Sequence, residues 1–299
     1  MTDRRIRLTI LCGYLGSGKT TWLRHQLHIG ARPHVIINEA AEMPVDDLLL
    51  AGANGLTVLA GGCACCTGRP ALIAALRELC DQRSAGAHIP EIILETSGLA
   101  DPGAIATAIQ NDPVLTHHLR LSRIIVLVDA LHGLVQLASD PLGRAQISAA
   151  DHLILTKTDS TDAAQLQATL RHLNPAAPLS ASAFGSPTPL PDYPAGTAPL
   201  TAFGNDTPPI TATKLSLPQL DWAGLSLWLS ALLHVHGDKL VRVKGTVQTP
   251  AGRLLIQAVR RTVQPPEILP ASPHENALVF IGHSISHDQL AASLARFTR

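Results

Sequence analysis

Short runs of aliphatic residues recur along the first 180 residues and alternate with segments of helical periodicity. The runs lie at 6–12, 34–38, 56–59, 91–95, 123–128 and 153–156, and each carries Ile, Val or Leu with little polar interruption. Strands that are covered by helices on both faces have this continuous apolar character, whereas half-exposed strands alternate. The pattern therefore predicts an α/β domain built on a doubly wound, mostly parallel sheet.

The composition changes between Asn174 and Pro209, a stretch that holds nine of the chain's 22 prolines and is typical of a loop-rich boundary. Beyond it, the pattern predicts an amphipathic helix at 220–229 and strands at 239–247, 253–263 and 277–281. Ser286, with Gln289 three residues later, has the capping-box spacing that opens a helix. We therefore predict a first domain at 1–185, a Pro-rich linker at 186–209 and a smaller α+β domain at 210–299.

A phosphate-binding loop connects the first predicted strand to the helix after it. Its sequence, Gly13-Tyr14-Leu15-Gly16-Ser17-Gly18-Lys19-Thr20, is a complete Walker A motif of a P-loop NTPase. The glycines let successive backbone N–H groups face phosphates at a helix N-terminus. Lys19 is expected to neutralise the β/γ oxygens and Thr20 to ligate Mg²⁺. The predicted phosphate contacts are Gly13, Gly16, Ser17, Gly18, Lys19, Thr20 and Thr21.

Two further motifs follow predicted strands, where the ligand-binding residues of a parallel sheet gather. In Thr156-Lys157-Thr158-Asp159, the aspartate can accept two hydrogen bonds from the ring N–H and the exocyclic amine of guanine. Adenine lacks that exocyclic donor and would leave a buried carboxylate without a partner, so GTP is favoured over ATP. We predict Thr156, Lys157 and Asp159 as base contacts.

The second motif, Glu95-Thr96-Ser97-Gly98, has the acid-x-x-Gly spacing of a γ-phosphate sensor. Glu95 would hold a Mg²⁺-bound water, and the Gly98 N–H would meet the phosphate. The predicted catalytic group is therefore Lys19, Thr20, Glu95 and Gly98.

Three thiols fall within four residues at Cys63-Ala64-Cys65-Cys66. Thiolates are soft ligands suited to Zn²⁺, Co²⁺ or Cu⁺. If the segment is extended, Cys63 and Cys65 share a face while Cys66 turns away, so the first two are the stronger candidates. Because two or three thiols leave a tetrahedral shell incomplete, the remaining ligands could be Glu39, Glu42, Asp112 or a histidine. A reactive thiol cluster or a structural turn is the alternative.

Charge and cysteine usage exclude several classes of function. The 299 residues contain 23 Lys plus Arg and 23 Asp plus Glu, so no basic field would attract nucleic acid or an anionic membrane surface. No signal sequence and no apolar stretch of about 18 residues is found, and the clustered thiols suit a reducing compartment, so we expect a cytoplasmic protein. Cys12 and Cys80 are expected to be buried core residues.

Together these motifs resemble the CobW-type family of metallochaperone GTPases. The resemblance rests on Gly13 to Thr20, Asn38-Glu39 with Glu42, Gly62-Cys63-Ala64-Cys65-Cys66, Glu95 to Pro102, Thr156 to Asp159, Val241 to Gly245 and Leu278 to Gly282. It implies a GTPase whose GTP or GDP state controls the binding of a transition metal, which we predict to be zinc before cobalt or iron. Slow intrinsic turnover is expected, because no residue stands out as a strong general base and no arginine is placed as an internal finger. It also implies delivery of that metal to a client metalloprotein.

One segment departs from the family's usual Asn-Glu-Phe-Gly-Glu. Here it is Asn38-Glu39-Ala40-Ala41-Glu42, without the aromatic and the glycine. The resemblance implies that Glu39 and Glu42 couple this switch to the metal thiolates, so the coupling in this chain can differ.

Three other functions fit the same residues. They are a client-specific activator, such as the accessory proteins of nitrile hydratase, a P-loop phosphotransferase, and a metal reservoir with regulatory nucleotide binding. The sequence also leaves open whether the protein is a monomer or a homodimer.

Overall fold

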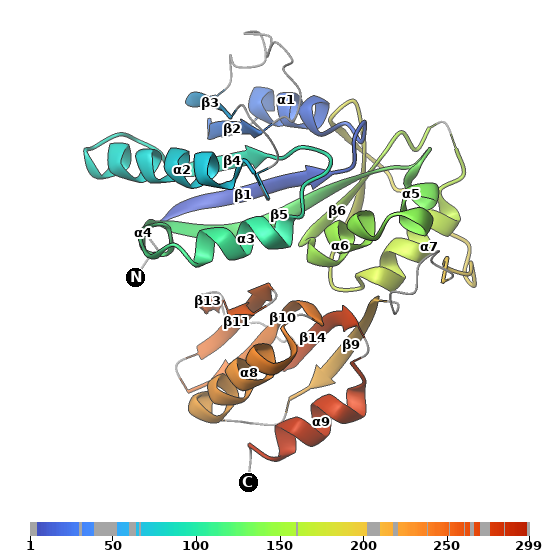
Figure 1. The fold of residues 1–299 in the computed structure, drawn as a ribbon. Coiled ribbons are helices and arrows are strands. Elements are labelled where there is room, and N and C mark those ends of the chain that lie inside the picture. The colour runs from blue at the N-terminus through green and yellow to red at the C-terminus, as the bar shows by residue number, and fades with distance from the viewer. Residues whose placement is uncertain are drawn as a thin grey trace.

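In the part of the chain that it describes, the structure, a computed structural model, contains two β-sheets, each with its own helices (Figure 1). It describes residues 5–29, 32–38, 53–59, 64–65, 67–159, 161–201, 210–217, 221–237, 239–250, 252–259, 261–263, 266–269, 276–283 and 285–297. Within these residues, no helix is long and apolar enough to cross a bilayer.

The larger sheet has the strand order β3-β2-β4-β1-β5-β6-β7-β8 in the described residues. Its strands are β1 (Ile6–Gly13), β2 (His34–Asn38), β3 (Gly55–Leu59), β4 (Glu91–Glu95), β5 (Leu119–Asp129), β6 (His152–Thr156), β7 (Leu179–Ala183) and β8 (Ser186–Thr188). All neighbours are parallel except β7 and β8. The six predicted strands and the predicted α/β class are therefore confirmed.

The sequence pattern missed β7 and β8, which lie in the Pro-rich stretch. The β7 strand is rich in Ser and Ala and lacks the β-branched residues that mark the other strands. It is held by parallel pairing with β6 and by a 2.8 Å hydrogen bond between Ser180 Oγ and His152 Nε2. The sheet thus continues a few residues beyond 185, while the limits of the linker remain a prediction.

Helices cover both faces of this sheet (Figure 1). Leu23 and Leu27 of α1 (Lys19–Ile29) pack against one face. The opposite face packs against α2 (Arg69–Ser84), α3 (Pro102–Gln110), α4 (Pro113–His118), α5 (Gly133–Ser139), α6 (Pro141–Ala149) and α7 (Ala164–Leu173). Helices α3, α4 and α6 each begin at an Asp-Pro pair, in which the aspartate caps the first N–H groups and the proline needs no hydrogen bond.

The smaller sheet is antiparallel, with the order β12-β11-β10-β14-β9 and β13 paired to β11. Its elements are β9 (Ile210–Ser216), α8 (Trp222–His236), β10 (Leu240–Thr249), β11 (Gly252–Val259), β12 (Thr262–Val263), β13 (Glu267–Leu269), β14 (Ala277–His283) and α9 (His287–Ala295). The capping box at Ser286 and Gln289 is confirmed. The strands β9 and β13 were missed, and the predicted strand at 253–263 is divided between β11 and β12.

Successive side chains of β14 pack alternately against the cores of the two domains. Leu278 and Phe280 face the core beneath α8 and α9, where Phe280 meets Trp228 edge to face at 5.9 Å. Val279 and Ile281 instead pack against the core of the larger sheet. The second domain therefore uses one face of its sheet for its own helices and the other for the first domain.

Candidate nucleotide and metal site

Three glycines shape the loop between β1 and α1. Gly13, Gly16 and Gly18 have φ values of 138°, 77° and 87°, which L side chains rarely adopt. A Cβ atom at Gly13 would also lie 2.4 Å from the Leu127 carbonyl oxygen of the neighbouring strand β5. The glycines of the motif are therefore required by backbone geometry.

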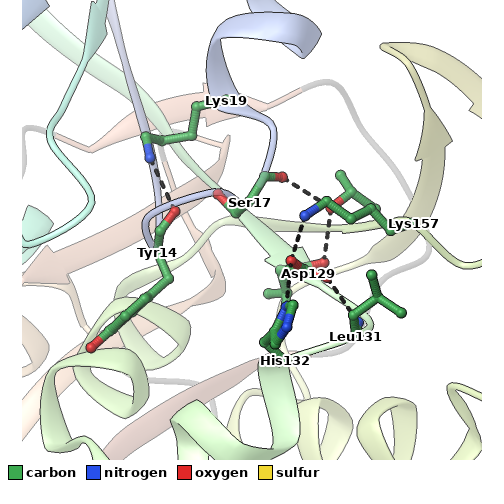
Figure 2. A network of polar contacts seen from close by, with 9 residues as sticks. Tyr14, Ser17, Lys19, Asp129, Leu131, His132 and Lys157 are labelled. Atoms are coloured by element: carbon green, nitrogen blue, oxygen red, sulfur yellow. Dashed lines mark hydrogen bonds and ion pairs between the residues drawn. The ribbon is translucent and has the colours of Figure 1, made fainter. Parts of the chain in front are cut away.

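The polar groups of this loop suit an anionic ligand. Lys19 Nζ donates to the carbonyl oxygens of Gly13 and Tyr14 at 2.9 and 3.1 Å, so the ammonium reaches back across the loop (Figure 2). Ser17 Oγ is buried and has no hydrogen-bond partner among the described residues. Because buried polar groups are almost always satisfied in native proteins, this hydroxyl indicates a polar ligand in the loop. The loop therefore has the donors that phosphate oxygens require.

An acid and a hydroxyl meet where β1 and β4 end. The Thr20 hydroxyl donates to Glu95 Oε1 at 2.5 Å, and Glu95 is 1% exposed. Hydroxyl and carboxylate oxygens are the ligands that Mg²⁺ prefers, either directly or through water. The structure thus brings these two predicted residues together.

The predicted phosphate sensor lies against the P-loop. A Cβ atom at Gly98 would be 2.5 Å from the backbone nitrogen of Leu15. Gln146 of α6 fixes the turn from the other side, donating to the carbonyl oxygens of Gly98 and Ala100 at 3.2 and 2.9 Å. The position of Gly98 relative to the loop is therefore set by direct backbone packing.

The loop after β6 is connected to the P-loop and to a residue that sequence reasoning missed (Figure 2). The Thr156 hydroxyl donates to the Ser17 carbonyl oxygen at 2.9 Å. Lys157, in a left-handed conformation with φ 58°, places Nζ 2.6 Å from Asp129 Oδ2. Asp129 directly follows the apolar run at 123–128 and lies at the carboxyl end of β5. This position is the sequence signal that could have identified Asp129.

Asp129 is ionised and anchored. Burial raises its pKa, but hydrogen bonds from the side chains of Lys157 and His132 and from the Leu131 N–H outweigh burial and leave the pKa below its usual value. The carboxylate is 3% exposed, and its Oδ1 accepts from Leu131 N at 2.8 Å. Asp129 therefore fixes the ammonium of a predicted base contact.

Replacement of Asp129 by Asn tests this positioning. We expect Asp129→Asn to weaken GDP binding about three- to tenfold, because a neutral amide holds the Lys157 ammonium less firmly. Titration calorimetry measures the affinity. The control is Asp221→Asn at the N-cap of α8, where Asn caps as well as Asp does. Equal GDP affinity in both variants and the wild type would contradict the role of Asp129.

A pocket of about 150 Å³ lies beside these loops. It is lined by Gly18, Thr21, Trp22, Thr156, Lys157, Asp159, Ser182, Ala183, Phe184 and Gly185. The last four residues, which follow or end β7, were missed together with that strand. Asp159 is exposed at the pocket, so a bound base would have to cover it for its carboxylate to be buried.

The described part of the cysteine segment is attached to β2. Ala64 donates its buried N–H to Asn38 Oδ1 at 2.7 Å, and the Arg69 guanidinium donates to the Cys65 carbonyl oxygen at 2.6 Å. Cys65 is half-buried against the core. Four of the predicted metal ligands lie outside the described residues: Cys63, Cys66, Glu39 and Glu42. Within the described residues, no three His, Cys, Asp or Glu side chains gather around a possible ion.

The remaining thiols and one candidate metal ligand, Asp112, have structural roles. Cys12 and Cys80 are buried as expected, and burial raises the pKa of Cys80 to about 11, which keeps this thiol protonated. Asp112 caps α4 through the N–H groups of Val114 and Leu115 and pairs with Arg77 at 2.7 Å. Its carboxylate is therefore engaged in structural contacts.

The fold and this loop geometry define a P-loop GTPase with a separate C-terminal domain. Residues 7–181 match the family model described as "CobW/HypB/UreG, nucleotide-binding domain", and residues 216–298 match the "Cobalamin synthesis protein cobW C-terminal domain". The chain belongs to this family, as the motifs predicted.

Relatives with curated names are similar over most of the chain. The Escherichia coli zinc chaperone YjiA is 32% identical over 97% of this chain and 98% of its own. The Pseudomonas aeruginosa zinc chaperone CobW is 30% identical over 86% of this chain and 81% of its own. A crystal structure of a zinc-bound triple mutant of the YjiA GTPase matches 99% of this chain and all of its own, with 25% identity and a TM-score of 0.69.

Proposed function

We propose that this protein is a GTP-hydrolysing zinc chaperone that delivers its metal to a client protein under the control of its nucleotide. The observation that carries the proposal is a short physical path between the two sites. Thr20 binds Glu95 at 2.5 Å, and Glu95 is the register partner of Ile37 in the adjacent strand β2. Asn38, the next residue, accepts from the N–H of Ala64, which stands within the Cys63-Ala64-Cys65-Cys66 segment.

In the proposed hydrolysis, the chain's own residues bind and orient GTP. The P-loop amides and Lys19 neutralise the phosphates, and Asp159 accepts hydrogen bonds from the guanine. Thr20 and Glu95 offer the oxygen ligands for Mg²⁺, which when bound supplies charge neutralisation at the β- and γ-phosphates. The Gly98 N–H is proposed to meet the γ-phosphate, so the turn at Glu95 to Gly98 responds to the loss of this phosphate.

The metal is cargo in this proposal. Cys63 and Cys65, with Cys66 as a third thiol, bind Zn²⁺, with Co²⁺ or Fe²⁺ as the other candidates, and Glu39 and Glu42 complete or switch the shell. A set of ligands that depends on the nucleotide state favours exchange over storage. The names of the relatives, zinc chaperones in both bacteria, support zinc as the cargo.

The experiment that tests GTP hydrolysis measures phosphate release from GTP and from ATP without any added acceptor. We expect slow release from GTP alone, since no described residue is placed as a strong general base. Release from ATP at an equal rate would contradict guanine recognition, and release that needs an acceptor would indicate a phosphotransferase.

Coupling between the sites is tested by measuring zinc affinity with a non-hydrolysable GTP analogue and with GDP, in competition with a chelator. We expect a difference of about five- to 150-fold, the usual range of coupling between two sites. Cys65→Ser is expected to weaken zinc binding in both nucleotide states. Cys80→Ala, which removes a protonated core thiol, is the control that leaves zinc affinity unchanged. Equal zinc affinity in both nucleotide states would contradict the proposed coupling but not the proposed GTP hydrolysis.

A further inference from the structure

The loop after β7 carries an aromatic residue, Phe184, with an exposed side chain and an unusual backbone conformation. Phe184 is 89% exposed, whereas large apolar side chains in this domain are mostly buried. Its φ value is 51°, in the left-handed region where a bulky residue is an outlier. Both features are unfavourable for the free protein, so the position of this ring requires a reason.

The neighbouring residues hold the backbone of this loop in place. Gly185, with φ 91°, packs so closely against α1 that a Cβ atom would lie 2.4 Å from His25 Cβ and 3.0 Å from the Thr21 carbonyl oxygen. Ser186 Oγ is 3.0 Å from His25 Nε2. The backbone on the carboxyl side of Phe184 is thus fixed on the helix that begins at the P-loop.

The location of Phe184 connects it to the base contacts. Among the described residues, Lys157 and Phe184 are the two non-glycine residues with positive φ. Both line the 150 Å³ pocket that also contains Asp159 and Trp22. Strained backbone of this kind is concentrated at functional sites. Two strained loops, from β6 and β7, therefore border one cavity next to the P-loop.

We propose that Phe184 is the platform on which the nucleotide base stacks. This inference rests on the proposed GTP binding and adds the residue that covers the base. The edge of the base is read by Asp159, whereas an aromatic ring contacts its face and is insensitive to its substituents. Covering the base would also bury the exposed ring of Phe184 and shield the Asp159 carboxylate from water.

The first test compares nucleotide affinities of Phe184→Ala and the wild type by titration calorimetry. We expect about five- to 100-fold weaker GDP binding, the range that aromatic stacking on a base contributes. GDP and IDP should lose affinity by the same factor, because stacking does not read the exocyclic amine. Ile268→Ala removes another exposed apolar side chain, in β13, and should leave both affinities unchanged.

The second test uses Phe184→Trp. A ring that stacks on guanine is expected to lose its fluorescence when GDP binds, beyond the change that Trp22 gives in the wild type. If Phe184→Trp binds GDP normally without this extra quenching, or if Phe184→Ala binds GDP as the wild type does, the stacking proposal is wrong and GTP binding stands. If the wild type does not bind GDP at all, the proposed function itself is wrong.

Discussion

Asp159→Asn is expected to transfer the base preference of this protein from guanine to xanthine. Asp159 accepts hydrogen bonds from guanine in the proposed complex, and an asparagine amide cannot accept both. A hydrogen bond to a charged group contributes about 1.5–3 kcal/mol, so the loss of one weakens GTP binding about 10- to 150-fold. Xanthine carries an oxygen in place of the exocyclic amine, and the asparagine N–H can donate to it. XTP should therefore bind Asp159→Asn better than it binds the wild type.

The measurement is a pair of affinities, for GDP and for XDP, in each protein. Asp162→Asn is the matched control: it lies three residues further along the chain, is exposed, and does not line the pocket. It should leave both affinities within about twofold. A variant at 159 that keeps its GDP affinity, or that loses GDP without gaining XDP, would contradict the role of Asp159 as the base reader.

Two kinds of structural feature could be predicted from the sequence. Strands buried on both faces were found because their apolar runs record burial directly, as at Ile6–Gly13 and Glu91–Glu95. The P-loop glycines were found because the positive φ values at Gly13, Gly16 and Gly18 demand glycine wherever that loop is built. Local backbone requirements and continuous burial are therefore readable from the chain.

Features that depend on contacts between residues distant in the sequence could not be predicted from the sequence. Asp129 matters because Lys157, 28 residues later, reaches it, and Phe184 matters because β7 adds to the sheet and α1 fixes the next residues. The strand β7 itself is stabilised by pairing with β6 more than by its own composition, since Ser and Ala have little preference for strands. Each of these features appears only once the strand order is known.

Gly98 packs directly against the backbone of the P-loop, and this contact leads to the second large effect. Gly98→Ala is expected to reduce GTP hydrolysis about 100-fold or more while leaving GDP binding nearly unchanged. A Cβ atom there would lie 2.5 Å from Leu15 N and 2.8 Å from Leu15 Cα, and backbone atoms of the P-loop cannot move aside as a flexible side chain would. The turn must shift away and take with it the N–H proposed to meet the γ-phosphate. Loss of one such transition-state donor typically costs 10²–10³ in kcat.

The measurement is single-turnover hydrolysis with the protein in excess, because intrinsic turnover is expected to be slow. Gly143→Ala in α6 is the matched control, since a Cβ atom at Gly143 has its nearest neighbour at an ordinary 3.6 Å and alanine suits a helix. Retained GDP binding shows that Gly98→Ala is folded. Because GDP lacks the γ-phosphate, a loss confined to GTP turnover separates the phosphate sensor from the rest of the loop. Wild-type turnover in Gly98→Ala would mean that this turn does not contact the reacting phosphate.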